Sequence, residues 1–272
     1  MEDFTIAIYC FVDDYLKIGH PKAGGKRKST DSQIITTALV AAKEFSGNFV
    51  KARCYLREVH GFVFPDKSNF NRHLHRLGQT IASLFFAFGQ LLKELNASSA
   101  YIIDSFPVNV CRNIRIKRCR LLDNEAYRGF NASKKEYFYG FKVQVVTTAG
   151  GLPVELFICA GSYHDITAFQ SMDVSLPEGS ELYGDSAYTK YGLEDLFLET
   201  EKVALLIDRK SNSKRKDSAA MKYIKKTMRK RIETTFTEIT NFFPRKIHAV
   251  TAKGFMLKIV LFIFAFTLSK SY

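Results

Sequence analysis

The stretch Y-I-I-D-S-F-P, Tyr101–Pro107, decides how the rest of the chain is interpreted. Its first residues form a short apolar, β-branched run, which is typical of a buried strand. The run ends in Asp104, and Pro107 cannot donate a hydrogen bond to a strand ladder. We therefore expect a strand that ends at a carboxylate. A turn capped by the Asp104 side chain would explain the same residues without any site.

A second stretch repeats this arrangement. E-L-Y-G-D-S-A-Y, Glu181–Tyr188, has the pattern of another short strand that ends in an aspartate, Asp185, followed by serine. A buried carboxylate is costly unless a positive charge lies against it. Two strands that each present Asp-Ser at their end therefore favour one shared carboxylate site over two unrelated turns.

The composition points to a polyanionic partner. The chain has 272 residues, 46% of them hydrophobic, and a formal net charge of +13. Nucleic acid is the first candidate for such a charge, and an anionic membrane surface is the competing one. The acidic start of the chain does not resemble a signal peptide, and the apolar run Ile259–Leu268 is shorter than the roughly 20 residues of a membrane span. We expect a core helix there and no membrane partner.

The cysteines indicate neither disulfides nor zinc. Five are scattered along the chain without a C-x-x-C pair. A reducing cytoplasm is the simplest location.

Residues 1–97 are predicted to be a helical DNA-binding region, with helices over about 4–18, 32–44, 49–59 and 70–95. Asp31 and Ser68 are the expected N-caps of the second and fourth helices. Gly61 and Pro65 separate the last two helices, as in a helix-turn-helix reader. The second of these helices opens with exposed polar donors, of which we expect Asn69, Arg72 and Arg76 to contact DNA. A solvated helix face is the alternative explanation.

Residues 98–272 are predicted to be a second domain with a mixed five-stranded sheet flanked by helices. The expected strands cover residues 100–104, 138–148, 154–159, 181–185 and 203–207. The basic segment 111–135 has no regular pattern. A long helix is expected over 221–243, and a nearly all-apolar helix over 254–268 should pack beneath the sheet.

The region before and within the long helix is strongly basic. Between Arg209 and Arg231 there are eleven basic residues and a single acid, Asp217. Such a stripe is expected to repel itself unless a polyanion lies along it. The residues expected to contact DNA here are Lys214, Arg215, Lys226, Arg229 and Lys230.

Glu233 is an isolated acid at the end of this stripe. An ion pair with Arg229, four residues earlier on the helix, is the simple explanation for it. The functional explanation is that Glu233 holds a cation among residues that contact phosphates. His164-Asp165 leaves two explanations open in the same way: Asp165 caps the helix that follows, or both residues support a nearby site.

Three carboxylates without histidine or cysteine suit Mg²⁺, which prefers hard oxygen ligands. Two such ions about 3.5–4 Å apart activate an oxygen nucleophile and neutralise phosphate charge in phosphoryl transfer. Asp104 is expected to bridge both ions, Asp185 to hold one and Glu233 the other. The spacing of these residues along the chain means that only a fold can unite them.

The order Asp, Asp, Glu on two strands and a late helix resembles the ribonuclease H-like core of DDE transposases. The motifs are similar, more narrowly, to bacterial insertion-sequence transposases of the insertion-sequence 982 group. They are Y-I-I-D-S-F-P-V-N-V-C from 101, E-A-Y-R-G-F-N-A-S-K-K-E-Y-F-Y-G-F-K-V from 125, Y-G-D-S-A-Y from 183, R-K-R-I-E-T from 229 and I-H-A-V-T-A-K-G-F from 247. D-S-Q-I-I-T-T-A-L-V-A-A from 31 and S-N-F-N-R-H-L-H-R-L from 68 extend the likeness into the N-terminal region.

The resemblance implies Mg²⁺-dependent cleavage at the ends of a mobile element, with Mn²⁺ as a substitute ion, and transfer of the 3′-hydroxyl into target DNA. It assigns the metal-ligand roles to Asp104, Asp185 and Glu233, and binding of terminal inverted repeats to the N-terminal region. Some related transposases have a tyrosine seven residues before the glutamate and a lysine seven after it. These positions are Lys226 and Thr240 here, so we expect no tyrosine–lysine clamp.

Double-stranded DNA is therefore the expected partner of a cytoplasmic, nucleoid-associated bacterial enzyme that acts as a dimer or larger assembly. A DNA-binding regulator that has lost catalysis and another metal-dependent nuclease of the same core are the alternatives. A two-carboxylate glycosidase is disfavoured, because a charge of +13 has no use on a neutral sugar.

Overall fold

The computed structural model describes residues 2–19, 28–132 and 134–272. The chain forms two compact units, of which the first contains residues 1–87 and 241–272 and the second residues 88–240. The sequence placed one boundary between residues 97 and 98. The units differ from that division mainly because the last 32 residues join the N-terminal helices, whereas the sequence assigned them to the second domain and expected residues 254–268 beneath the sheet.

The first unit is helical and is built around α2 (Asp31–Glu44). Ten of the 14 residues of α2 are buried, and it packs against α1, α3 and α9. Thr30 rather than Asp31 caps α2, in a reciprocal capping box with Gln33. The remaining helices of this unit are α1 (Glu2–Gly19), α3 (Phe49–His60), α4 (Lys67–Arg76), the first part of α5 (Gly78–Glu94) and α9 (Ala252–Ser271).

α3 and α4 are joined by the turn that the sequence predicted. Gly61 ends α3 with a φ of +64°, a left-handed conformation that favours glycine. Asp66 then caps α4 by accepting hydrogen bonds from the backbone N–H groups of Ser68 and Asn69. The cap is therefore Asp66 and not Ser68. The single helix expected over 70–95 is broken at Leu77 into α4 and α5.

α9 is longer than its apolar run suggested. By length and composition alone it is the one helix among the described residues that could cross a membrane. The share of its most apolar window that is buried inside the protein is 67%, and α2 covers part of it. This degree of burial is typical of a core helix, which is what the sequence predicted.

The second unit contains a mixed sheet of six strands. Five follow the order β2-β3-β1-β5-β6, and β4 also pairs with β3, along residues 141–147, whereas β2 pairs with residues 136–139. β1 pairs antiparallel with β3 and parallel with β5, and β5 pairs parallel with β6. The strands are β1 (Ala100–Cys111), β2 (Arg128–Asn131), β3 (Glu136–Thr148), β4 (Pro153–Ala160), β5 (Glu181–Gly184) and β6 (Ala204–Ile207). A helical region followed by a mixed sheet flanked by helices confirms the predicted fold class.

The sheet has one strand more than predicted. β2 lies in the segment that the sequence left irregular, because R-G-F-N has no apolar run and owes its extension to pairing with β3. β1 is also longer than expected and continues through Pro107. Proline is tolerated there because β5 ends at Gly184 and leaves that edge of β1 without a partner.

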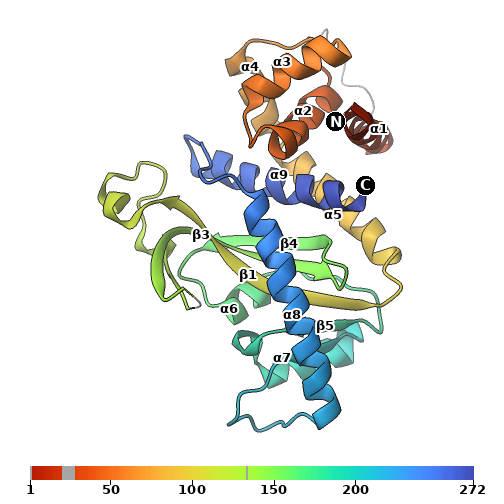
Figure 1. Cartoon of the computed structure of the whole chain (residues 1–272), viewed down its shortest axis with the longest axis vertical. Coiled ribbons are helices and arrows are strands. Elements are labelled where there is room, and N and C mark those ends of the chain that lie inside the picture. The colour runs from red at the N-terminus through yellow and green to blue at the C-terminus, as the bar shows by residue number, and fades with distance from the viewer. Residues whose placement is uncertain (1, 20–27, 133) are drawn as a thin grey trace. The chain divides into compact units, whose positions relative to one another are not determined.

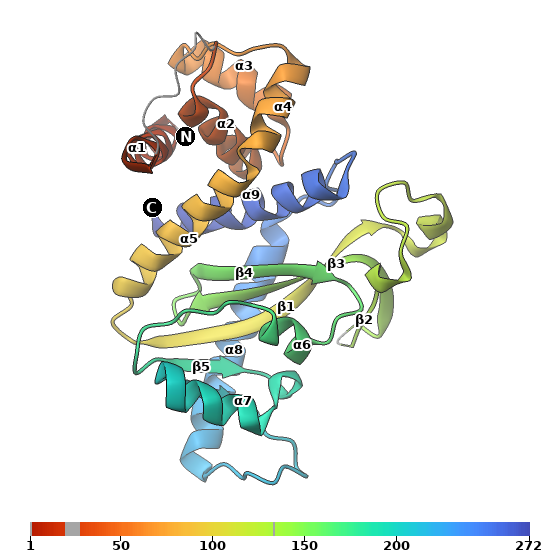
Figure 2. The ribbon, with the colours of Figure 1, turned by 180° about the vertical axis from the view of Figure 1, so that it is seen from behind.

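Helices cover both faces of the sheet. α8 (Ala219–Phe242) crosses one face, while α6 (Asp165–Gln170) and α7 (Tyr191–Leu196) lie on the opposite face, as the two views show (Figures 1 and 2). Phe106 of β1 packs edge-to-face on Phe236 of α8. Since alternate residues of a strand face opposite sides, Asp104 faces α8 with Phe106, and Ser105 faces α6.

Candidate active site

Three neighbouring strands of the sheet each present an aspartate at the same level. The parallel register pairs Ile102 with Tyr183 and Gly184 with Ile207. Two residues further along β1, Asp104 is level with Asp185, which follows β5 directly. Asp208 follows β6 and donates its backbone N–H to Gly184. The carboxyl ends of β5 and β6 thus meet the middle of β1 in a row of three carboxylates.

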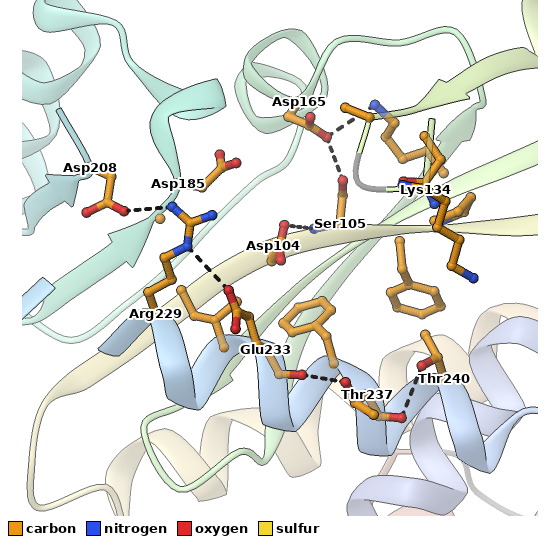
Figure 3. A pocket seen from close by; sticks show the side chains of 18 of the residues that line it. Asp104, Ser105, Lys134, Asp165, Asp185, Asp208, Arg229, Glu233, Thr237 and Thr240 are labelled. Carbon is orange, nitrogen blue, oxygen red and sulfur yellow. Dashed lines mark hydrogen bonds and ion pairs between the residues drawn. The ribbon is translucent and has the colours of Figure 1, made fainter. Parts of the chain in front are cut away.

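α8 brings a fourth carboxylate to this row. Glu233 lies on the turn of α8 that faces the strand ends, together with Arg229 one turn earlier (Figure 3). The Arg229 guanidinium lies 3.4 Å from Glu233 and 3.5 Å from Asp208. The ion pair between Arg229 and Glu233 that the sequence left as the simple explanation therefore exists, and Asp208 extends it to the sheet.

These groups line one cavity of about 570 Å³, within the second unit. Asp104, Asp185 and Glu233, which lie far apart in the sequence, all contribute to its wall. Figure 3 shows Arg229 on one side of the carboxylates and Lys134 on the other. A cavity with an acidic centre and cationic flanks can hold cations in the middle and a phosphate backbone across them.

Burial sets the electrostatics of the acidic centre. It raises the pKa of Asp104 to about 7, an effect that the backbone N–H of Ser105 partly offsets and the nearby Asp185 carboxylate reinforces. Burial also raises the pKa of Asp185, against the hydrogen bond that its carboxylate accepts from the backbone N–H of Ala187 at 2.8 Å. Both carboxylates would therefore be stabilised in their charged form by a cation placed between them.

Asp165 supports the centre from the opposite face of β1. Its carboxylate accepts a 2.6 Å hydrogen bond from Ser105 and lies 3.2 Å from the Lys142 ammonium. Gln144 donates to the Asp165 backbone carbonyl. Asp165 is the first residue of α6, His164 occupies the cap position, and none of the described side chains caps this helix. The capping explanation for Asp165 was therefore wrong, and the residue lines the cavity instead.

The donor set suits a hard divalent cation. The cavity offers carboxylates, with no cysteine or histidine among the described residues that line it. Among residues 2–19, 28–132 and 134–272, however, no three Asp, Glu, His or Cys side chains are gathered closely enough to hold an ion. For Glu233 to share an ion with Asp104 and Asp185, its side chain has to move from its position beside Arg229.

The expected DNA contacts on α8 and the preceding connector have unequal surroundings. Lys214, Lys226 and Lys230 are exposed. Arg215 is also largely exposed, but its guanidinium makes two 2.7 Å hydrogen bonds to Asp195. Other basic residues of the stripe are neutralised as well, since Lys225 pairs with Asp217 and Arg209 with Glu194. The free charge of the stripe is thus concentrated on fewer residues than the sequence suggested.

The expected contacts in the first unit lie on the exposed side of α4. Asn69, Arg72 and Arg76 are all exposed, and the Asn69 amide hydrogen-bonds to Asp66. His73 points the other way, is buried and bonds to Asp31 at 2.6 Å. The structure thus keeps a polar face on α4 available to a partner.

Sequence reasoning missed Asp208 as a member of this site. The signal was available, because L-L-I-D repeats the pattern of an apolar strand followed by aspartate that marked the other two strands. It also missed the hairpin of β2 and β3, which contributes Phe130, Asn131 and Lys134 to the cavity. That contribution follows from strand pairing, which the residues of β2 alone do not reveal.

Comparison with known proteins gives one match. No curated protein and no solved structure resembles the chain significantly. The family model described as "Transposase DDE domain" matches residues 95–249, more than half of the chain and the whole of the candidate site. The chain is therefore a member of the DDE transposase family.

Proposed function

We propose that the protein is a DNA transposase that cleaves at the terminal inverted repeats of an insertion sequence and transfers the 3′-hydroxyl end into target DNA. The observation that carries this proposal is the cavity to which Asp104, Asp185 and Glu233 all contribute, inside the matched transposase domain. The motifs of the insertion-sequence 982 group support a place in that group.

The proposed active site uses Asp104, Asp185 and Glu233 to hold two Mg²⁺ ions, with Mn²⁺ as a substitute. Bound ions of this kind lower the pKa of an attacking oxygen and neutralise the leaving oxygen. Asp104 is level with Asp185 on the neighbouring strand and faces α8, which carries Glu233, so it suits the bridging position. Arg229, one helical turn from Glu233, is placed to contact a phosphate when Glu233 turns to a metal.

DNA would be contacted by both units. We propose Asn69, Arg72 and Arg76 of α4 for the inverted repeat, and Lys214, Arg215, Lys226, Arg229 and Lys230 for the backbone near the cleaved bond. Two DNA ends have to be joined to one target, so a dimer or larger assembly on DNA is part of the proposal. The place of action is the bacterial cytoplasm, at the nucleoid.

The decisive experiment is cleavage of a duplex that carries the inverted repeat flanking the gene. Wild type, Asp185→Ala and Glu233→Gln are compared in Mg²⁺, Mn²⁺ and EDTA. We expect metal-dependent nicking at the repeat end that either substitution reduces at least a hundredfold, because a lost ligand leaves the charge on the reacting phosphate unbalanced. Lys190→Ala, at an exposed lysine before α7 that does not line the cavity, is the control and should cleave normally.

The alternatives predict different results. Tight binding of the repeat without cleavage in any metal would favour a regulator that has lost catalysis. Cleavage without preference for the repeat would favour a general nuclease of the same core.

A further inference from the structure

Phe130 and Tyr137 form an exposed aromatic pair on the hairpin of β2 and β3. They are directly opposite each other in the antiparallel register, with ring centroids 5.0 Å apart. Phe130 is 50% exposed and Tyr137 63%. A single exposed aromatic is ordinary, but two in contact form an apolar surface that water solvates poorly. The rings are tilted by 58° to each other, so the pair offers the exposed part of each ring, not one flat surface, to a ligand.

Phe130 is also part of the wall of the candidate active site. Among the described residues that line the cavity, the other aromatic side chains, Phe106, Phe138, Tyr183 and Phe236, are all buried. Phe130 is thus the only cavity aromatic in that set with a face open to a ligand. Its neighbours Asn131 and Lys134 line the same wall.

The segment that contains the pair is basic. The short helix η1 (Asn113–Arg118) is attached to the hairpin by a 2.7 Å hydrogen bond from the Asn113 amide to the backbone carbonyl of Tyr137. Residues 111–137 contain eight basic side chains against three acids. Of the eight, Arg128 pairs with Glu125. Apart from Arg128, the exposed basic residues of this segment are Arg112, Arg115, Lys117, Arg118, Arg120, Lys134 and Lys135.

We propose that Phe130 and Tyr137 bind one unpaired DNA base beside the phosphodiester that the enzyme cleaves. Aromatic side chains in a basic groove are how proteins bind single-stranded nucleic acid, because every base has a face that can stack. The acidic centre would act on the backbone while the adjacent base leaves the duplex and stacks on Phe130, with Tyr137 behind it. This inference rests on the proposed action on DNA.

A purely structural role is the competing explanation. Cross-strand aromatic pairs stabilise antiparallel hairpins, and β2 is an edge strand that such a pair would hold in place. That role requires ring contact alone. It does not require that Phe130 line the cavity, nor that the hairpin belong to a strongly basic segment. Only the stacking explanation predicts that affinity changes when the unpaired base is removed from the DNA.

The test measures affinity for three forms of the repeat end in Ca²⁺, in which cleavage is slow. One duplex is fully paired, the second has a single unpaired base next to the cleaved phosphate, and the third has an abasic site there. Wild type should bind the unpaired base between about fivefold and 150-fold more tightly than the abasic site, the value of one stacked base.

Variants assign this preference to the pair. Phe130→Ala and Tyr137→Ala should bind the unpaired-base and abasic duplexes equally, and Phe130→Trp should keep the preference. Ile114→Ala is the matched control, because Ile114 is exposed on η1 outside the cavity. The thermal unfolding temperature of every variant is measured as well, because a variant that has lost the hairpin should unfold at a lower temperature, whereas one that has lost only stacking should not.

The outcomes distinguish this inference from the proposed function. Equal wild-type affinity for the unpaired-base and abasic duplexes, with tight binding of the paired repeat, overturns the stacking site alone. A preference that survives in Phe130→Ala also overturns it and leaves the pair a structural role. Failure to bind any of the three duplexes overturns the proposed function together with the inference.

Discussion

Asp104 is a carboxylate on a central strand whose neighbours Ile103 and Phe106 are buried. In the absence of a cation it has little compensation, since its nearest hydrogen-bond donor is the backbone N–H of Ser105 at 2.7 Å. Burial raises its pKa to about 7, so near neutral pH the charge is held at a cost in folding free energy. A residue that lowers stability in the free protein is typical of a functional site.

We predict that the metal-free Asp104→Asn variant is more stable than the metal-free wild type, by a difference that grows as the pH rises. The pKa is about 3.8 in the unfolded chain and about 7 in the folded one, so the folded state binds more protons and stability falls between these values as pH rises. The amide does not titrate. In EDTA, the difference in unfolding free energy between variant and wild type should grow by roughly 2–3 kcal/mol from pH 5 to pH 8.

Urea unfolding at the two pH values measures this difference, and exposed Asp123→Asn is the matched control. A pH-independent difference would show that the charge of Asp104 is already compensated. Adding Mg²⁺ at pH 8 should stabilise wild type more than Asp104→Asn, because binding to the folded state alone adds to stability.

Lys93 and Glu155 are also buried charged residues, but each compensates the charge of the other in an ion pair. Their side chains are 3% and 7% exposed and form an ion pair between the end of α5 and β4, and Lys93 also donates to the Ser175 carbonyl. Lys93→Met should lower the unfolding free energy by about 3–5 kcal/mol, because it leaves the Glu155 charge buried without a partner.

The double variant Lys93→Met with Glu155→Leu, which removes both charges, should recover most of that loss in denaturant unfolding. If the double variant is as unstable as the single one, packing rather than charge explains the effect.

At the scale of elements, α4 and α8 carry their polar residues in different ways. α4 is a ten-residue helix that presents exposed donors, and its start depends on the carboxylate of Asp66. α8 is a 24-residue helix with a buried apolar side and an exposed basic side. The first can be weakened locally without touching the sheet, and the second cannot, because Phe236 packs on β1.

We predict that Asp66→Ala weakens α4 specifically. Loss of an N-cap costs about 1 kcal/mol, so amide hydrogen exchange in Lys67–Arg76 should become about fivefold faster while the sheet is unaffected. Asp66→Asn keeps a capping oxygen and should exchange at nearly the wild-type rate. Equal acceleration in both variants would mean that the charge of Asp66, and not its cap, holds the helix.

For the whole molecule, the net charge of +13 makes DNA affinity depend on salt. Each phosphate contact adds about 0.9 to the slope of log affinity against log salt. Lys226→Ala with Lys230→Ala should therefore reduce the magnitude of that slope by about 2. Lys190→Ala, an exposed lysine before α7, should leave it unchanged. An unaltered slope in the double variant would show that Lys226 and Lys230 do not contact the phosphates of DNA.

Sequence could predict those parts of the fold that local pattern determines. The apolar runs of β1, β3, β4 and β5, with an Asp-Ser pair within β1 and another directly after β5, were sufficient to select Asp104 and Asp185 as candidates. Three features depend on distant partners and were not found: β2 is a strand because β3 pairs with it, α9 packs on α2, and Asp165 bonds to Ser105. The break at Leu77 was hidden because the apolar stripe continues through it.

The order in which the carboxylates occur along the chain has a consequence for synthesis. β1 is made early, but its parallel partner β5 begins 81 residues after the first residue of β1, and Glu233 follows later still. A growing polypeptide that has passed α4 does not contain all residues of the candidate site until α8 emerges. Prematurely terminated products therefore lack Glu233 and also α9, which packs on α2, so neither unit of the chain is complete in them.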